Sequence, residues 1–402
     1  MNLNHEFNRS YLTAAERIQI YLLMAIFGFG IFAATPRANS LKSNLNVNNQ
    51  LYGVLVTLGA IGASFGFIYS GKIVQKFGSQ KVLFLSATLL YGFYATIPHI
   101  HIWWLYLIIN ISLGFAISGY NAASFSLVVA REVETKQYLM ARFQGSWSIG
   151  VLLTSLLAYL IAPYISFACH VDTIAGISWL LTMLIIYRLK ESFSTVDKDE
   201  TSNLTFTLRA IKESISLDYL LVAGFTCGVF MEFVAGDWTT LVMHQEFKSS
   251  ITTSIGIYFL FVLAMIIGRM SAPFLINHNS EKFWLLIATL VGGSTSLIGF
   301  ETGHLMVHSN HNLALILESI GFFFGGLGTS IISPIFSNAV VRRSPEHPAQ
   351  AISKLWFTHS VINTILRLCF SAIVGISSIS TSLVIPAVLL IGSSFFVSVA
   401  QK

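Results

Sequence analysis

The sequence predicts an all-α membrane protein with twelve transmembrane helices arranged as two six-helix bundles. Hydrophobic residues make up 54% of the 402 residues and charged residues only 10%, whereas a soluble domain carries about 25% charged residues. The apolar runs approach or exceed about 18 residues, the length of a membrane helix. Barrel strands are about half as long, and lipid tolerates only helices or closed barrels, so helices cross the membrane.

Each span follows from one apolar run bounded by polar residues. The twelve runs are 18–40, 49–70, 81–99, 102–130, 139–163, 166–188, 218–244, 252–275, 282–301, 312–340, 350–376 and 380–400. The longest polar interruption, 190–216, is predicted to be a cytoplasmic linker. It separates an N-terminal six-helix bundle (1–189) from a C-terminal six-helix bundle (217–402).

Lysine and arginine residues mark one side of the membrane. Most lie in loops after even-numbered helices, including Arg269, which is assigned to the loop after helix 8. Only Arg37, Lys42 and Lys248 lie in the opposite loops. The positive-inside rule then places the basic loops and both chain termini in the cytoplasm. The polar first 17 residues do not resemble a signal peptide, so the first run is expected to remain as a helix.

Several classes of function are disfavoured by what the sequence lacks. The three cysteines lie in apolar runs without metal-ligand or disulfide spacing, and there is no His-Glu-x-x-His run or phosphate-binding glycine loop. A membrane-embedded enzyme needs a nucleophile–base pair or a metal cluster, and a sensor needs an output domain. We therefore expect no catalytic residue, metal or cofactor. The expected partners are a small-molecule solute, the bilayer and protons, with no nucleic acid and no implied oligomer.

A loop motif carries a family resemblance. The segment 71–81 reads Gly-Lys-Ile-Val-Gln-Lys-Phe-Gly-Ser-Gln-Lys. It resembles the loop 2–3 signature of the major facilitator superfamily. Four positions match that signature: Gly71, Lys76, Gly78 and Lys81. Gln75 replaces the aspartate that helps to latch the cytoplasmic side in that family, and Gly268-Arg269 resembles a degenerate second copy.

Further segments resemble one branch of this superfamily, a group of poorly characterised bacterial inner-membrane carriers. They are 34–53, 142–150 and 232–238. The resemblance implies a multi-pass inner-membrane carrier that moves a small organic solute by alternating access, with proton-coupled symport as the expectation. A passive facilitator and a drug or metabolite efflux carrier are the alternatives. Helix 5 lacks the Gly-Pro signature of the drug–proton antiporters, which disfavours efflux by that route.

Polar residues at membrane depth are the candidate binding residues, because they are costly in lipid and tend to face a cavity. Helix 11 carries four polar or aromatic residues at spacings of three, four and four, which place them on one face. The predicted substrate-binding residues are Trp356, His359, Asn363 and Arg367, with Asn121, Gln144 and Trp147 from helices 4 and 5. For a single asparagine, an interhelical hydrogen bond is the alternative.

Three charges are predicted to share one depth in the C-terminal half. At 1.5 Å per residue, Glu232, Glu318 and Arg367 all lie about 20 Å from the cytoplasmic surface. Two acids would then share one arginine, and the acid without a partner would carry the coupling proton. Glu232 is the first candidate and Glu318 the second, while a fixed structural ion pair is the alternative.

One further charge lies near the outer surface. Arg37 is predicted to be a gate residue that contacts the C-terminal half at Asp237, which should lie at a similar height. The alternative is an arginine that extends its charged end to the interface.

Overall fold

The computed structural model describes residues 12–135, 139–189, 215, 218–278, 280–344 and 348–400. In these residues twelve helical stretches are long and apolar enough to cross a membrane, which confirms the predicted fold class. The predicted linker lies outside the described residues except for Ile215, and so do residues 1–11 and 401–402.

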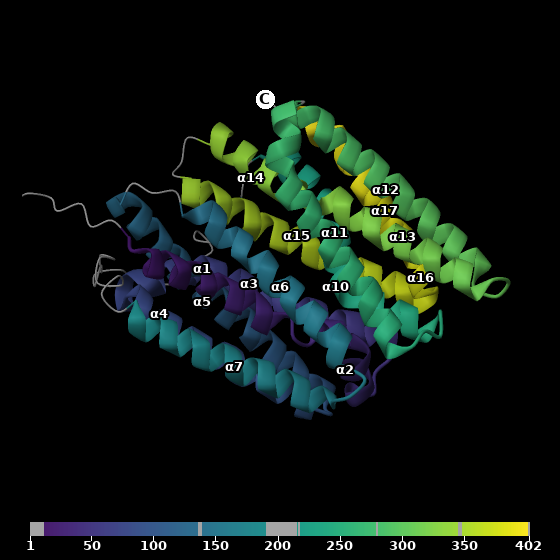
Figure 1. Cartoon of the computed structure of the whole chain (residues 1–402), viewed down its shortest axis with the longest axis horizontal. Coiled ribbons are helices and arrows are strands. Elements are labelled where there is room, and N and C mark those ends of the chain that lie inside the picture. Colours follow the sequence, from purple (N-terminus) through teal and green to yellow (C-terminus); the bar gives the residue numbers. More distant parts are fainter. Residues whose placement is uncertain are drawn as a thin grey trace, which may run out of the picture.

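The N-terminal half supplies the first six spans (Figure 1). They are α1 (Ala14–Ile31) with η1 (Thr35–Arg37) and α2 (Ala38–Leu45), α3 (Asn49–Phe77), α4 (Ser79–Thr96) with η2 (Ile97–His99), α5 (Trp103–Thr135), α6 (Met140–Ile161) and α7 (Phe167–Arg188). Thr13 caps the N-terminus of α1, because its hydroxyl accepts from the Glu16 N–H while the Glu16 carboxylate accepts from the Thr13 N–H.

The C-terminal half supplies the other six, drawn in green and yellow in Figure 1. They are α10 (Tyr219–Gln245), α11 (Ile251–His278), α12 (Glu281–Met306), α13 (His311–Ser330) with α14 (Ile332–Arg343), α15 (Pro348–Ile376), and α16 (Ile379–Ser382) with α17 (Val384–Gly392), η3 (Ser393–Phe396) and α18 (Val397–Ala400). Twelve spans return the chain to the side on which it started. We call the side where α1 begins and α18 ends the near side, and the opposite side the far side.

Small residues and side-chain hydrogen bonds hold neighbouring helices together. Gly62 of α3 lies against the Ile111 carbonyl of α5, where any side chain would collide with the backbone. In the same interface the Asn110 amide donates to the Leu55 carbonyl and the Ser118 hydroxyl donates to the Ala63 carbonyl, both at 2.9 Å. These are the contacts expected in lipid, where helix association depends on close packing and interhelical hydrogen bonds. Asn110 and Ser118 therefore act in packing.

Contacts between the halves close the far side. α2 packs on α10, and the Gln245 amide donates to the Asn39 side-chain oxygen at 3.3 Å. About two turns further in along α10, the rings of Tyr52 and Trp238 meet edge to face with centroids 5.8 Å apart. α3 also packs along α15 and α6 along α11, so each half contributes helices to the shared boundary.

Two of the helix breaks within the spans receive hydrogen bonds from side chains of neighbouring helices. The first span leaves the α-helix after Ile31 and resumes as η1, and the tenth span breaks between α13 and α14 at Ile331. A helix end leaves backbone carbonyls without partners inside the helix. Here side chains supply the donors: the Tyr94 hydroxyl donates to the Ile31 carbonyl, and Arg269 donates to the Ser330 carbonyl at 3.2 Å.

Candidate functional site

Two ion pairs connect α10 to its neighbours inside the membrane-spanning region. Asp237 pairs with Arg367 of α15, and Glu232 pairs with Arg269 of α11 at 3.1 Å. The two acids lie five residues apart on α10, which corresponds to a rise of about 7.5 Å. Each acid therefore has its own arginine, and the two pairs form successive levels along one helix.

The Asp237–Arg367 pair lies at the boundary between the halves. Tyr52 of α3 and Tyr106 of α5 are close enough to interact electrostatically with both members of the pair. The ring of Phe233 lies under the guanidinium carbon of Arg367 at 5.8 Å. The Arg367 side chain is only 12% exposed, and its buried Nε has no hydrogen-bond partner in the described part of the chain. Arg367 therefore keeps a free donor at this boundary.

The Glu232–Arg269 pair reaches across the boundary. One Arg269 Nη donates to both Glu232 carboxylate oxygens at 3.1 and 3.2 Å, and the other donates to the Ser148 hydroxyl of α6 at 3.2 Å. The Trp147 ring lies 5.9 Å from the guanidinium carbon. Arg269 Nε donates to the Ser330 carbonyl at the helix break. One guanidinium thus joins α10, α13 and the N-terminal half.

Gly268 permits this arrangement. A Cβ at position 268 would lie 2.6 Å from the Cβ of Ser330, closer than real side chains approach. The missing side chain lets α11 approach the end of α13 closely enough for Arg269 to reach the carbonyl. In the Gly268-Arg269 pair, the glycine therefore allows the close approach of the helices and the arginine makes the hydrogen bond between them.

Residues of the predicted polar face of α15 pack against α10. The His359 ring is surrounded by Phe225, Phe233 and Trp356, with centroids 4.9, 5.5 and 5.7 Å away. Its Nδ1 lies 3.0 Å from the Thr226 hydroxyl. Several buried polar atoms near this boundary have no hydrogen-bond partner within the described residues, although such atoms are normally satisfied. They include His359 Nε2, Asn363 Oδ1 and, on α5, Asn121 Oδ1.

Glu318 lies apart from both pairs, in the interior of the C-terminal half. It is 0% exposed, and neither carboxylate oxygen has a partner among the described residues. It packs on Gly303 of α12, and its electrostatic neighbour is Glu246. Glu246 accepts from the backbone N–H groups of Ile379 and Ser380 at 2.6 and 3.0 Å.

The predicted sharing of one arginine by Glu232 and Glu318 is wrong. Arg367 pairs with Asp237, and Glu232 pairs with Arg269. Arg269 itself was misplaced, because it lies inside α11 and inside the eighth span, not in the following loop. The apolar run continues past Arg269 to Leu275. This continuation was the available signal that the helix does not end at the charge.

The predicted contact between Arg37 and Asp237 is also wrong. Asp237 is held by Arg367, whereas both Nη atoms of Arg37 donate to the Ile165 carbonyl at 3.4 and 3.3 Å. Of the α6 candidates, Trp147 lies at the boundary beside Arg269, while the Gln144 side chain is exposed.

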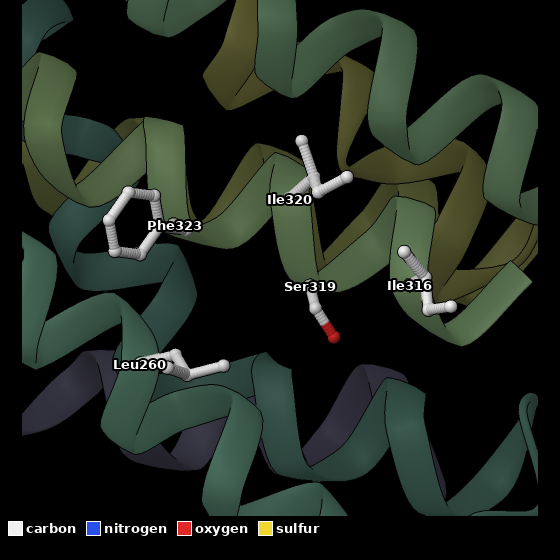
Figure 2. Close-up of a pocket in the computed structure, with 5 residues that line it drawn as sticks. All are labelled: Leu260, Ile316, Ser319, Ile320 and Phe323. Atoms are coloured by element: carbon white, nitrogen blue, oxygen red, sulfur yellow. The ribbon is translucent and has the colours of Figure 1, made fainter. Parts of the chain in front are cut away.

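An apolar groove lies elsewhere, between α11 and α13 (Figure 2). It has a volume of about 260 Å³ and is lined by Leu260, Ile316, Ser319, Ile320 and Phe323. Its only polar side chain, Ser319, donates to the Leu315 carbonyl at 2.6 Å. Leu260, Ile316 and Ile320 are exposed at membrane depth, so the groove belongs to the lipid-facing flank.

The comparisons with known proteins agree with this architecture. A family profile described as Major Facilitator Superfamily matches residues 20–366. The chain belongs to the major facilitator superfamily. The cis,cis-muconate transport protein of Acinetobacter baylyi is 22% identical to this superfamily member over 343 residues, covering 80% of this chain and 79% of that protein.

Other superfamily members extend the comparison. The niacin transporter of Acinetobacter baylyi is 26% identical over 153 residues, covering 35% of this chain and 32% of that protein. A crystal structure of a D-xylose–proton symporter aligns with TM-score 0.70 and 16% identity, covering 95% of this chain and 96% of that chain. A nucleoside transporter structure aligns with TM-score 0.67 and 13% identity, covering 96% and 99%. The protein is thus a multi-pass membrane transporter of the class that moves small solutes.

Proposed function

We propose that this carrier is a symporter that moves a small organic acid together with a proton. The observation that carries the proposal is the Asp237–Arg367 pair at the boundary between the halves. A guanidinium matches the planar geometry of a carboxylate and binds it through two parallel hydrogen bonds. Arg367 already binds one carboxylate, that of Asp237, so a solute carboxylate can take the same place.

The proton follows from this exchange. When the solute carboxylate binds Arg367, Asp237 loses its counter-charge in a region where an unpaired ion is costly. Binding one proton makes Asp237 neutral and removes that cost. One carboxylate group and one proton then cross together, so a monocarboxylate such as nicotinate moves with no net charge. When the solute leaves, Asp237 releases the proton and pairs with Arg367 again.

Glu232 and Glu318 are weaker candidates than Asp237 for the residue that binds the coupling proton. Glu232 is occupied by Arg269, and its pair reaches Ser148 of the other half, so we assign it to holding the halves together. Glu318 lies inside the C-terminal half, is 0% exposed and is therefore away from the boundary between the halves.

Uncharged polar atoms and aromatic rings near the boundary can contact the parts of the solute other than its carboxylate. His359 Nε2, Asn363 Oδ1 and Asn121 Oδ1 are buried polar atoms without partners within the described residues. Trp147 and Trp356 supply aromatic surface. The muconate and niacin transporters among the relatives support the substrate class, because both named solutes carry carboxylates. We propose a location in the inner membrane, as the resemblance to inner-membrane carriers implies. The distribution of lysine and arginine supports cytoplasmic termini.

Uptake by the purified carrier in liposomes tests this function. Nicotinate and muconate should accumulate when the outside is more acidic than the inside, and a protonophore should abolish the accumulation. Nicotinamide has the same ring without the charge and should not accumulate. Arg367→Gln should remove uptake of both acids. Equilibration that ignores the pH gradient would instead identify a passive facilitator, and absence of any acid uptake would exclude the substrate class.

A further inference from the structure

A second group of buried polar side chains lies at the far side, away from the two ion pairs. Arg37, at the end of η1, is 6% exposed, and His170 of α7 is 1% exposed. The two side chains are close enough to interact electrostatically. The positive charge of Arg37 is thus buried beside an imidazole, and a buried charge is costly when no anion accompanies it.

The polar atoms of this group are not satisfied by the described residues. Both ring nitrogens of His170 and the Nε of Arg37 are buried without a hydrogen-bond partner there. The two Nη atoms of Arg37 share a single acceptor, the Ile165 carbonyl, at long distances of 3.4 and 3.3 Å. Buried donors are normally satisfied, so the group is short of acceptors.

The start of α7 adds to the positive potential. His170 lies in the first turn of this 22-residue helix, which begins at Phe167. The N-terminus of a helix carries a partial positive charge, although here the Ser166 hydroxyl already accepts from one of its N–H groups, that of Cys169, at 3.1 Å. The Phe167 ring lies 5.8 Å from the Arg37 guanidinium carbon. The acid on the same turn, Asp172, pairs with His99 at 2.9 Å.

We infer that Arg37, His170 and the N-terminus of α7 form a second carboxylate-binding site, which receives the anionic solute from the far side. The inference rests on the proposed function, because it assigns the site to the same class of solute. Thr35 of η1 lies 3.8 Å from the position of a Cβ on Gly236, the residue before Asp237. The segment that carries Arg37 therefore lies beside the segment of α10 that carries Asp237, at the far end of the boundary.

The closed far side accounts for the burial of the site. Asn39 of α2 is bonded to Gln245 of α10, and α2 continues directly from η1. Separation of α2 from α10 moves the segment that carries Arg37. The site is thus occluded in this form and reached when the far side opens.

Binding of radiolabelled nicotinate to the full-length carrier in lipid nanodiscs tests the inference. The assay uses the Arg367→Gln background, in which the central carboxylate site is removed. One saturable nicotinate site should remain, and nicotinamide should not compete for it. Adding Arg37→Gln or His170→Gln should raise its Kd about tenfold or more, the usual effect of losing a hydrogen bond to a charged group. Arg37→Lys should retain part of the affinity, and Lys42→Gln, a matched change of charge in the same span, should leave Kd unchanged.

The outcomes separate the two proposals. If wild type binds nicotinate and Arg367→Gln binds none, the second site is overturned while the symporter proposal stands. Residual binding that is unaffected by both Arg37→Gln and His170→Gln also overturns it. If the wild-type carrier shows no acid uptake in the separate liposome assay, the proposed function is contradicted.

Discussion

Arg367 of α15 is held by Asp237 of α10, one level farther along that helix than the Glu232–Arg269 pair. Tyr52 and Tyr106 of the other half lie within electrostatic range of Asp237 and Arg367. The pair therefore lies where the two halves meet. A change in its partners alters the electrostatic environment of residues in both halves.

Replacing Asp237 by asparagine should uncouple transport from the pH gradient. Asparagine keeps the shape of the side chain but cannot take up a proton. We expect proton-driven accumulation of nicotinate to fall at least about tenfold, the effect of about 1.4 kcal/mol, while exchange of labelled for unlabelled solute continues. Accumulation in vesicles with an imposed pH gradient, compared with counterflow without one, measures both. Accumulation at the wild-type level would contradict the assignment of the proton to Asp237.

Glu318→Gln should transport and couple like the wild type, within about twofold. Glu318 lies inside the C-terminal half and touches neither arginine pair, and glutamine has nearly the same volume. The initial rate of nicotinate uptake against external pH is the measurement. A flattened pH profile in this variant, with Asp237→Asn unaffected, would move the coupling proton to Glu318.

The Glu232–Arg269 pair should show strong coupling in a double-mutant cycle. Arg269→Gln leaves Glu232 as an unpaired acid in a partly buried site, and breaking a buried pair costs about 3–5 kcal/mol. Glu232→Gln together with Arg269→Gln should recover a large part of that loss. Thermal unfolding of the purified carriers in detergent gives the order of stabilities. Additive effects of the two single changes would show that the pair does not act as a unit.

Linking Asn39 to Gln245 should stop transport. Their side chains meet at 3.3 Å across the far side, so cysteines at both positions can be joined by a short thiol-specific cross-linker. We expect uptake to fall to the level of empty vesicles after cross-linking and to return after reduction. Variants that carry only one of the two introduced cysteines, treated in the same way, are the controls, because the chain also has three native cysteines. Transport at the uncross-linked rate would mean that this contact does not open during the cycle.

The helices were predictable from sequence because apolar length alone decides them. The predicted span 49–70 is Asn49–Phe77 in the structure and 282–301 is Glu281–Met306, each extended mainly at its C-terminal end. The predicted common depth of Glu232 and Arg367 is not found, because Arg367 pairs with Asp237, five residues and about 7.5 Å farther along α10. Apolar length also leaves the rotation of each helix about its axis undetermined. Glu232 and Asp237 differ by five residues, hence by about 140° around α10, and only packing decides which of them faces Arg367.

Arg269 shows a second limit of the sequence. A charge in an apolar run indicates the start of a loop, but a buried acceptor can keep a charge inside the membrane. The acceptors of Arg269, which are the Glu232 carboxylate, the Ser330 carbonyl and the Ser148 hydroxyl, all lie far from it in sequence. Their proximity depends on the break between α13 and α14, which hydropathy does not reveal.

Arg269 connects that break to the boundary between the two halves. Its guanidinium holds the free carbonyl at the end of α13 and, at the same time, the Ser148 hydroxyl on the opposing half. Parting α6 from α11 removes the bond to Ser148 and leaves Arg269 bonded to the Ser330 carbonyl of the tenth span and to Glu232 of α10. We therefore expect separation of the halves at this point to alter how firmly Arg269 holds the break in the tenth span.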